Sequence, residues 1–306
     1  MPDPIRDPHP PDAPPRPHDG HKGTFGTVVV VGGSTTMPHA PAICGRAALR
    51  AGCGLLKIAT QADVLAAALL TEPSATGIVL GGDGRREDPL TRLDHADPEK
   101  RCVLAVGPGM GQAGQGIAGE RFVVALLHGS RPIVVDADGL NLLAGSGQRH
   151  AADGPPCVLT PHPGEFRRLA RVAGIRQDPT DPEQRVAAAA ELARFHAAIV
   201  VLKGRHTVVT DGERAFVNGN GNPALATAGT GDVLTGVIAS LTAQGRTAYD
   251  AAALGVHLHG AAADEWSRRR GRAGLLAREL ADELPDALET YRITTEPRSG
   301  SSDRPA

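Results

Sequence analysis

Short runs of β-branched and other apolar residues alternate with longer alanine-rich stretches along most of this chain. Strands that are apolar at every position are typical of parallel sheets covered by helices on both faces. The runs predicted to be strands are residues 27–31, 55–59, 102–106, 132–135, 157–160 and 199–202, and then a hairpin of 207–210 and 214–218. The pattern therefore predicts an α/β fold with a mostly parallel central sheet.

Glycines and polar residues follow most of these runs directly. The segments are Gly32-Gly33-Ser34, Gly107-Pro108-Gly109-Met110-Gly111, Asp136-Ala137-Asp138, Pro161-His162-Pro163-Gly164-Glu165 and Lys203-Gly204. In open sheets of this kind, ligands bind beyond the carboxyl ends of the strands. We therefore expect these segments to line one cleft.

The proline-rich residues 1–22 and the last residues, 294–306, contain too little apolar surface to offset the entropy of ordering, so both are predicted to be disordered tails. The remaining residues, 23–293, are predicted to form one domain. A net charge of −2 argues against nucleic-acid binding. No apolar run is long enough to cross a membrane. The four cysteines form no CxxC pair, which is typical of reduced thiols in a cytoplasmic protein.

The strongest local motif is Gly229-Thr230-Gly231-Asp232, which opens an apolar helical run. Free amides at a helix start bind anions, and glycines let a phosphate approach closely. A carboxylate in the same turn suits proton abstraction from a hydroxyl that attacks a phosphoryl group. Asp232 is also explained as a helix cap or a partner of the helix dipole. The Walker A sequence GxxxxGK[ST] is absent.

Three further segments carry candidate chemistry, each with a structural alternative. The segment from Lys203 to Thr207 offers an ammonium, a glycine and a hydroxyl to a phosphate, or is simply a strand-to-hairpin turn. His162 stands between prolines that would hold its ring in one direction. Asp136 and Asp138 would face one cation if the strand breaks after them, or one of them caps a helix. No GxGxxG stands in a dinucleotide-binding context, which disfavours a Rossmann oxidoreductase.

Taken in order, these segments resemble the ADP- or ATP-dependent NAD(P)H-hydrate dehydratase family, a ribokinase-like group. The resemblance spans about residues 24–265 and also includes Ala40, residues 47–55, residues 218–223 and Gly229-Thr230-Gly231-Asp232-Val233-Leu234-Thr235-Gly236. It implies a three-layer α/β/α sandwich with a mostly parallel central sheet. It also implies a repair reaction in which NADH or NADPH hydrated at carbon 6 of the nicotinamide ring loses water. In that reaction ADP or ATP phosphorylates the hydroxyl, and phosphate is then eliminated.

The resemblance assigns roles residue by residue. The hydrated nicotinamide would contact Ala40, Gly109, Gly111, His162 and Asp232. The nucleotide would contact Lys203, Gly204, Arg205, His206, Thr207, Asn222 and Gly231. Asp232 would accept the hydroxyl proton while the amides of Gly229, Thr230 and Gly231 hold the transferred phosphoryl group. Asp136 and Asp138 would lie near the phosphates and Mg²⁺.

The first loop, residues 35–40, departs from the family pattern because Met37 replaces an aromatic residue and His39 replaces a glycine. The short segment before the first strand leaves no room for the N-terminal epimerase domain of many relatives. We therefore expect action on the S hydrate alone, a functional link to a separate epimerase, and a homo-oligomer, a tetramer as in relatives. The alternatives are a ribokinase-like kinase acting on a vitamin-precursor alcohol and a nucleotide-binding sensor without catalysis.

Overall fold

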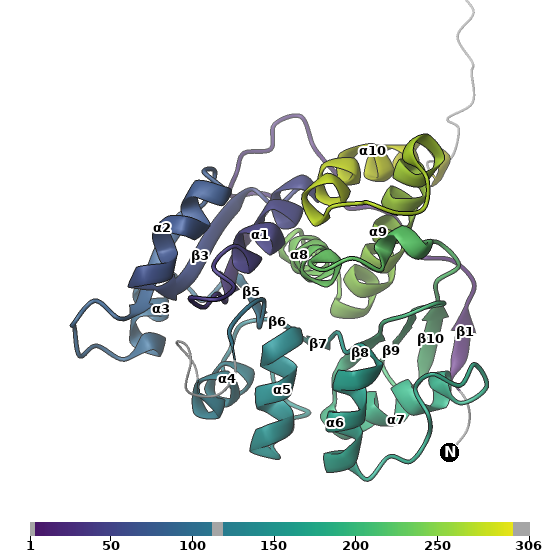
Figure 1. The fold of residues 1–306 in the computed structure, drawn as a ribbon, viewed down its shortest axis with the longest axis horizontal. Helices are drawn as coiled ribbons and strands as arrows, with labels where there is room; N and C mark the ends of the chain where they lie inside the picture. The colour runs from purple at the N-terminus through teal and green to yellow at the C-terminus, as the bar shows by residue number, and fades with distance from the viewer. Residues whose placement is uncertain (1–3, 112–118, 296–306) are drawn as a thin grey trace, which may run out of the picture.

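A ten-stranded sheet forms the middle of the molecule (Figure 1), and the computed structural model describes residues 4–111 and 119–295. The strands are β1 (Ile5–Asp7), β2 (Thr27–Val31), β3 (Leu55–Gln61), β4 (Thr76–Gly81), β5 (Val103–Val106), β6 (Ile133–Val135), β7 (Cys157–Leu159), β8 (Ile199–Leu202), β9 (Val208–Thr210) and β10 (Arg214–Val217). Their order is β1-β10-β9-β8-β7-β6-β5-β2-β3-β4. The seven strands from β8 to β4 run parallel, and β9 is antiparallel to both neighbours.

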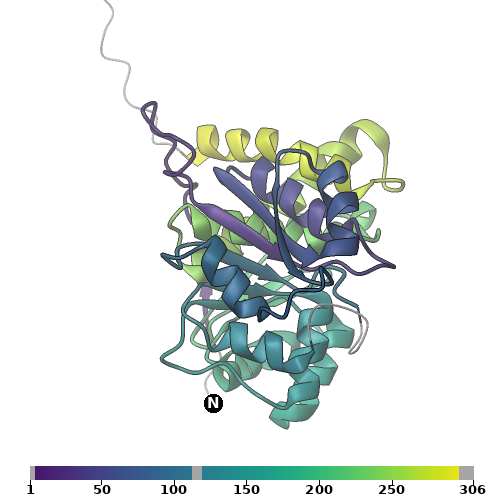
Figure 2. The ribbon, with the colours of Figure 1, turned by 90° about the vertical axis from the view of Figure 1, so that its left-hand side faces the viewer.

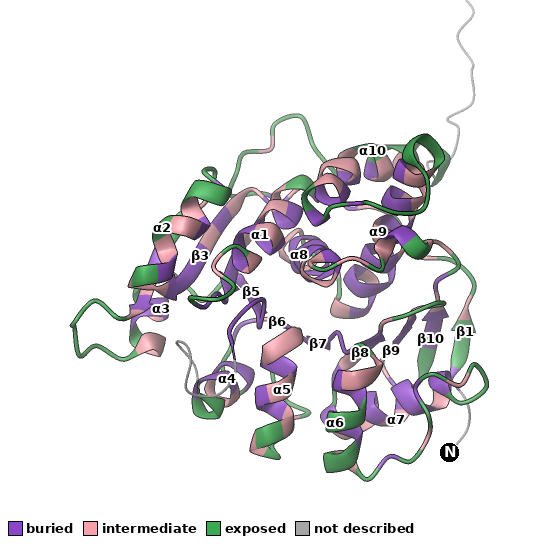
Figure 3. Ribbon diagram, in the orientation of Figure 1, coloured by how far each residue is buried: buried purple, intermediate pink, exposed green. Residues whose placement is uncertain are grey.

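The valine-rich strands separate two cores, as the continuous apolar runs predict. Val28 and Val30 of β2 belong to one hydrophobic cluster, and Val29 and Val31 belong to another on the opposite face. Successive side chains of a strand point to opposite faces of a sheet, so a strand with no polar position must be covered twice. Figure 3 shows the central strands buried and the outer helix faces exposed.

Helices cover both faces and produce three layers (Figure 2). The helices are α1 (Ala40–Arg50), α2 (Ala62–Thr71), α3 (Pro89–Ala96), α4 (Glu120–Leu127), α5 (Ala137–Ser146), α6 (Pro163–Ala173), α7 (Arg185–His196), α8 (Thr230–Ala243), α9 (Ala248–Arg270) and α10 (Ala277–Thr295), with a 3₁₀ turn at Pro223–Leu225. Helices α1, α8, α9 and α10 share one core, and α3 to α7 share the other. The predicted α/β/α sandwich with a mostly parallel sheet is confirmed.

The register aligns the carboxyl ends of the parallel strands. Val31 pairs with Val106, Val106 with Val135, and Val135 with Leu159. The residues that follow these positions must therefore leave the sheet along one edge. Every segment that the sequence placed in a single cleft begins at this edge.

The N-terminal segment differs from the expectation of a disordered tail. Strand β1 extends the sheet by pairing with β10, and the tyrosine hydroxyl of Tyr249 donates to Asp7 at 2.5 Å. Tyr291 donates to the carbonyl of Pro10 at 2.9 Å, and Arg292 donates to that of Pro14 at 3.0 Å. Prolines have little backbone entropy to lose, and side chains from α10 satisfy the carbonyls of Pro10 and Pro14. Ordering this segment therefore needs little apolar burial.

Besides β1, strand β4 is absent from the strands that the sequence predicted. β4 contains Gly77 and ends at Gly81, and its side chains are exposed at Thr76, so it lacks a continuous apolar pattern. Of the C-terminal residues predicted to be disordered, 294–306, those from 296 onward lie outside the described residues. Residues 294 and 295 form the end of α10. None of the helices in residues 4–111 and 119–295 combines the length and the hydrophobicity of a membrane-spanning segment.

Candidate active site

Glycines allow the loops after β2, β5 and β6 to touch one another. The amide of Gly33 donates to the carbonyl of Pro108 at 2.9 Å, and a Cβ at Gly32 would lie 2.2 Å from that oxygen. A Cβ at Gly107 would lie 1.8 Å from the carbonyl oxygen of Asp136. Any side chain at these positions would force the loops apart, so the strand ends require glycine there.

Three of the residues predicted to contact the nicotinamide come together at this edge. A Cβ at Gly109 would lie 2.7 Å from the Cβ of Ala40, at the start of α1. The amide of Gly111 donates to Asp138 Oδ2 at 2.9 Å, which connects the loop after β5 with the first turn of α5. Met37 of the atypical first loop is also close to Gly109, because a Cβ added at Gly109 would lie 3.0 Å from the Cβ of Met37.

Asp136 lies at the base of the site and is 1 % exposed. Its Oδ1 accepts a hydrogen bond from Lys203 Nζ at 2.6 Å, and its Oδ2 accepts one from Thr235 Oγ1 at 2.8 Å. Burial raises the pKa of the carboxyl, but the Lys203 ammonium and the hydrogen bonds outweigh burial and hold the pKa below its usual value. Asp136 thus ties the ends of β6 and β8 to helix α8.

The start of α8 has the geometry of an anion-binding helix terminus. Gly229 precedes the helix with φ 86°, in the left-handed region. The amides of Gly231 and Asp232 make no hydrogen bond among the described residues, whereas the amide of Thr230 makes a long one to Thr227, at 3.4 Å. Unpaired amides at a helix N-terminus carry a partial positive charge that favours anions.

Lys203 points to the same place. A Cβ at Gly231 would lie 3.3 Å from Lys203 Nζ and 3.6 Å from Asp136 Oδ2, so the ammonium lies against the first turn of α8. A phosphate held by the amides of this turn would be within reach of that ammonium. The two segments that the sequence associated with phosphate are therefore adjacent.

Asp232 in the first turn of α8 has a pKa raised to about 7. Burial is the main cause, and the nearby carboxylate of Asp136 adds to it, while the Lys203 ammonium lowers it. A carboxylate that titrates near neutrality is a competent general base at physiological pH. The helix-cap alternative is disfavoured, because Gly229 occupies the cap position and no side-chain cap bond is made.

His162 and Glu165 form a reciprocal cap at the start of α6. His162 Nδ1 accepts from the amide of Gly164 at 2.9 Å, and Glu165 accepts from the amide of His162 at 2.8 Å. The other ring nitrogen, Nε2, lies 3.3 Å from Glu165 Oε1. Glu165 is buried, which raises its pKa to about 7 although Lys203 opposes the shift. The ring of His162 is thereby held in one direction, at the end of β7 beside the site.

The segment from Lys203 to Thr207 forms an exposed turn after β8. Gly204, Arg205 and His206 are exposed, and the hydroxyl of Thr207 donates to the carbonyl of Gly204 at 2.9 Å. The side chains of Arg205 and His206 have no hydrogen-bond partner among the described residues. The turn thus presents polar groups to the solvent next to Lys203.

Asn222 differs from the other predicted nucleotide contacts because its side-chain amide is hydrogen-bonded to other residues of the protein. Its Nδ2 donates to the carbonyl of Ala263 at 3.0 Å and to Asp264 at 2.7 Å. Its Oδ1 accepts from the amide of Ala224 at 2.9 Å and from Ser267 at 2.8 Å. Asn222 joins the 3₁₀ turn to α9, so it shapes the segment before Gly229 instead of presenting a free amide.

Asp136 and Asp138 do not fit a side-chain metal site. Both oxygens of Asp136 are already paired, and Asp138 accepts from Gly111. In the part of the chain that the structure describes, no group of three or more His, Cys, Asp or Glu side chains could hold a metal ion. A lysine pairs with Asp136 where a cation was expected.

Sequence reasoning missed three side chains that support the site. Thr235, one helical turn after Gly231, donates a hydrogen bond to Asp136, and Glu165 contacts both the amide and the ring of His162. His259 of α9 lies with Nε2 2.9 Å from the carbonyl of Thr230, and burial lowers its pKa to about 4. The one available signal was the spacing of Thr235, four residues after Gly231, which places both on the same helix face.

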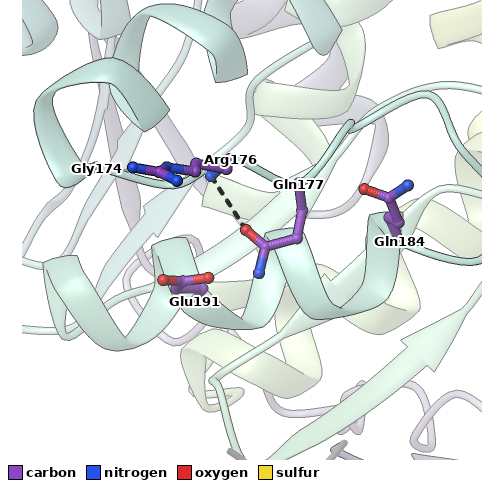
Figure 4. Close-up of a pocket in the computed structure, with 5 residues that line it drawn as sticks. All are labelled: Gly174, Arg176, Gln177, Gln184 and Glu191. Carbon is purple, nitrogen blue, oxygen red and sulfur yellow. Dashed lines mark hydrogen bonds between the residues drawn. The ribbon is translucent and has the colours of Figure 1, made fainter.

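An open depression elsewhere on the surface contains none of these residues. It is lined by Gly174, Arg176, Gln177, Gln184 and Glu191, near the connection between α6 and α7 (Figure 4). The amide of Arg176 donates to the side chain of Gln177 at 3.2 Å there. It lacks the convergent strand ends and the helix terminus that characterise the candidate site.

Known proteins share both the sequence and the fold. The model of the NAD(P)H-hydrate dehydratase family matches residues 28–286. The ADP-dependent (S)-NAD(P)H-hydrate dehydratase of Neisseria meningitidis is 40% identical over 273 residues, which cover 87% of this chain and 86% of the relative. The bifunctional NAD(P)H-hydrate repair enzyme Nnr of Moorella thermoacetica is 42% identical over 92% of this chain, and the chain spans about half (53%) of that relative's length.

A solved structure gives the same result for the fold. The ADP/ATP-dependent NAD(P)H-hydrate dehydratase of Bacillus subtilis, co-crystallised with ATP and Mg²⁺, superimposes with a TM-score of 0.75. The identity is 31%, and the match covers 92% of this chain and 95% of the other. The ribokinase-like sandwich is therefore common to both proteins.

Proposed function

The chain belongs to the NAD(P)H-hydrate dehydratase family, and on that premise we propose that it uses ADP or ATP to dehydrate (6S)-NADHX and (6S)-NADPHX to NADH and NADPH. The observation that carries this proposal is the meeting of three groups at one point. At the first turn of α8 lie the Asp232 carboxyl, whose pKa is raised to about 7, the Lys203 ammonium, and the amides of Gly231 and Asp232, which have no hydrogen-bond partner among the described residues.

The proposed first step is phosphoryl transfer to the hydroxyl on carbon 6 of the ring. Asp232 takes the hydroxyl proton as the oxygen attacks the terminal phosphorus, and the bond to the nucleotide's bridging oxygen breaks. The amides of Gly231 and Asp232 and the Lys203 ammonium stabilise the charge on the transferred group. ADP would leave as AMP in this step, and ATP as ADP.

The second step is elimination. The bond between carbon 6 and oxygen breaks with loss of a proton from carbon 5, which restores the ring double bond and releases phosphate. Phosphate is a much better leaving group than hydroxide, so the first step supplies the driving force for the second. Ala40, Gly109, Gly111 and His162 are proposed to hold the hydrated ring, and residues 203–207 the nucleotide.

Mg²⁺ is proposed to arrive with the nucleotide phosphates, since Asp136 and Asp138 do not fit a metal site; bound there, it would neutralise phosphate charge. In this proposal, no side chain of the protein ligates the metal.

We further propose that the protein acts on the S hydrate while a separate epimerase converts the R form. We also propose that it is a homotetramer and that it is located in the cytoplasm. Unconverted R hydrate in an epimerase-free assay and a tetrameric mass in solution are the expected results.

The test is a turnover assay with purified protein, (6S)-NADHX, Mg²⁺ and either ADP or ATP. Recovery of NADH absorbance together with phosphate release is expected, and the nucleotide that supports it identifies the donor. Phosphorylation of a small alcohol, without recovery of NADH, would indicate a kinase of this fold instead. Nucleotide binding without turnover on any hydrate or alcohol would indicate a sensor.

A further inference from the structure

Arg185, the first residue of α7, is a buried cation without a carboxylate partner among the described residues; it is 9% exposed. Its Nη1 donates to the carbonyl of Arg205 at 2.8 Å, and its Nη2 donates to that of Leu202 at 3.1 Å. A longer contact of 3.5 Å joins Nη2 to the carbonyl of Lys203. Burying an unpaired cation at the positive end of a helix dipole is unfavourable, so its retention needs a reason.

The contacts of Arg185 determine which way the turn after β8 faces. In a planar trans peptide, the carbonyl and the following N–H point in opposite directions. The carbonyls of Lys203 and Arg205 point at the guanidinium, so the amides of Gly204 and His206 point away from it. Neither amide has a hydrogen-bond partner within the described ranges.

The backbone of the turn is also in an unusual conformation. Gly204 has φ 133° and His206 has φ 55°, both in the left-handed region. Glycine adopts a positive φ at little cost, but a residue such as His206 keeps one only when its surroundings hold it. Turns that present backbone amides in this way form anion-binding concavities. The guanidinium fork of Arg185, whose two terminal nitrogens donate to the carbonyls of Leu202 and Arg205, supports this turn from beneath.

We propose that Arg185 is a positioning residue that holds residues 203–206 with their amides facing the nucleotide. Its uncompensated charge lies beneath the same turn and adds to the attraction for phosphate. The inference rests on the proposed function, because it takes ADP or ATP as the ligand of this turn.

The test compares three variants by calorimetric titration with ADP in the presence of Mg²⁺. Arg185→Met removes the fork and the charge, and we expect an about tenfold weaker Kd, equivalent to about 1.4 kcal/mol. Arg185→Lys keeps the charge, but one ammonium cannot reproduce a rigid fork, so we expect an intermediate loss of about threefold. In turnover assays KM for the nucleotide should rise while kcat at saturation changes less than about twofold.

Arg194→Met is the matched control. Arg194 lies on the same helix and donates to the carbonyl of Gly212 in the β9–β10 turn, away from the site. Its removal should leave the Kd for ADP unchanged. Wild-type affinity in folded Arg185→Met would overturn the inference, and wild-type affinity in Arg185→Lys would do so if Arg185→Met does not fold. Wild-type protein that binds neither ADP nor ATP would overturn the proposed function as well.

Discussion

The carboxyl of Asp232 titrates near neutrality because burial disfavours its charge and Asp136 lies close by. The contacts proposed for phosphate are backbone amides and the Lys203 ammonium. Replacing the carboxyl of the base should therefore leave the phosphate contacts in place. Asp232→Asn should lower kcat by about 10²- to 10⁴-fold, the usual contribution of a general base. The Kd for ADP, measured by calorimetry, should stay within about twofold, because the amides are unchanged. A variant with near wild-type kcat would mean that Asp232 serves only the helix start.

Lys203 and Asp136 form a buried ion pair, so a change in one alone affects folding as well as binding. Lys203→Met leaves the Asp136 carboxylate buried without its cation, which costs about 3–5 kcal/mol in comparable pairs. We expect a marked fall in Tm and weaker ADP binding.

The double variant Asp136→Asn/Lys203→Met separates the two effects. The neutral amide no longer needs a cation and still accepts from Thr235, so much of the lost Tm should return while ADP binding stays weak. Recovery of ADP affinity together with stability would show that Lys203 has no contact with the nucleotide.

At the scale of elements, the N-terminal segment, residues 5–16, acts as a strap: it pairs with β10 at the side of the sheet and contacts helices α9 and α10. Strand β1 covers β10, which would otherwise be an exposed edge, and Arg16 reaches the carbonyl of Gly52 at 2.6 Å. Deletion of residues 1–16 should lower Tm by several degrees and increase aggregation on heating, because free edge strands pair between molecules. Differential scanning fluorimetry with light scattering measures both. The control is Arg6→Ala, an exposed position of β1, which should change neither, and an unchanged Tm after deletion would contradict the role of the strap.

The elements that sequence reasoning predicted are those with a strong local pattern. The apolar run of β2 must be buried on both faces, and the glycine-rich segments after it and after β5 must turn sharply. The sequence did not predict β1 or the paired state of Asp136, because both depend on partners far along the chain. Asp7 meets Tyr249 and Asp136 meets Lys203 only after folding. The metal role expected for Asp136 was inferred without knowledge of this pairing, because an acidic motif does not reveal that a lysine far along the chain contacts it.

At the scale of the whole molecule, two groups of buried side chains respond to pH in opposite senses. Asp232 and Glu165 have pKa values raised to about 7, so the folded state binds protons that the unfolded state releases. Their contribution to stability is complete at pH values below their unfolded pKa and is lost as pH rises through about 7. His196 and His259 have pKa values lowered to about 4 by burial. Their contribution is complete above about 6.5 and is lost as pH falls toward 4.

These two transitions overlap, because between about pH 4 and pH 7 the carboxyls lose stability and the histidines gain it as the pH rises. The free energy of unfolding, measured by urea denaturation from pH 5 to pH 8.5, should therefore depend only weakly on pH. Asp232→Asn removes one falling contribution, so stability should rise with pH between about 5 and 6.5, and His196→Phe, at the end of α7 and away from the site, should make stability fall over the same range. Turnover needs Asp232 ionised, so kcat should rise through about pH 7 as the same ionisation lowers stability. An Asp232→Asn variant whose stability has the same pH dependence as that of the wild type would show that Asp232 does not carry this conflict between folding and catalysis.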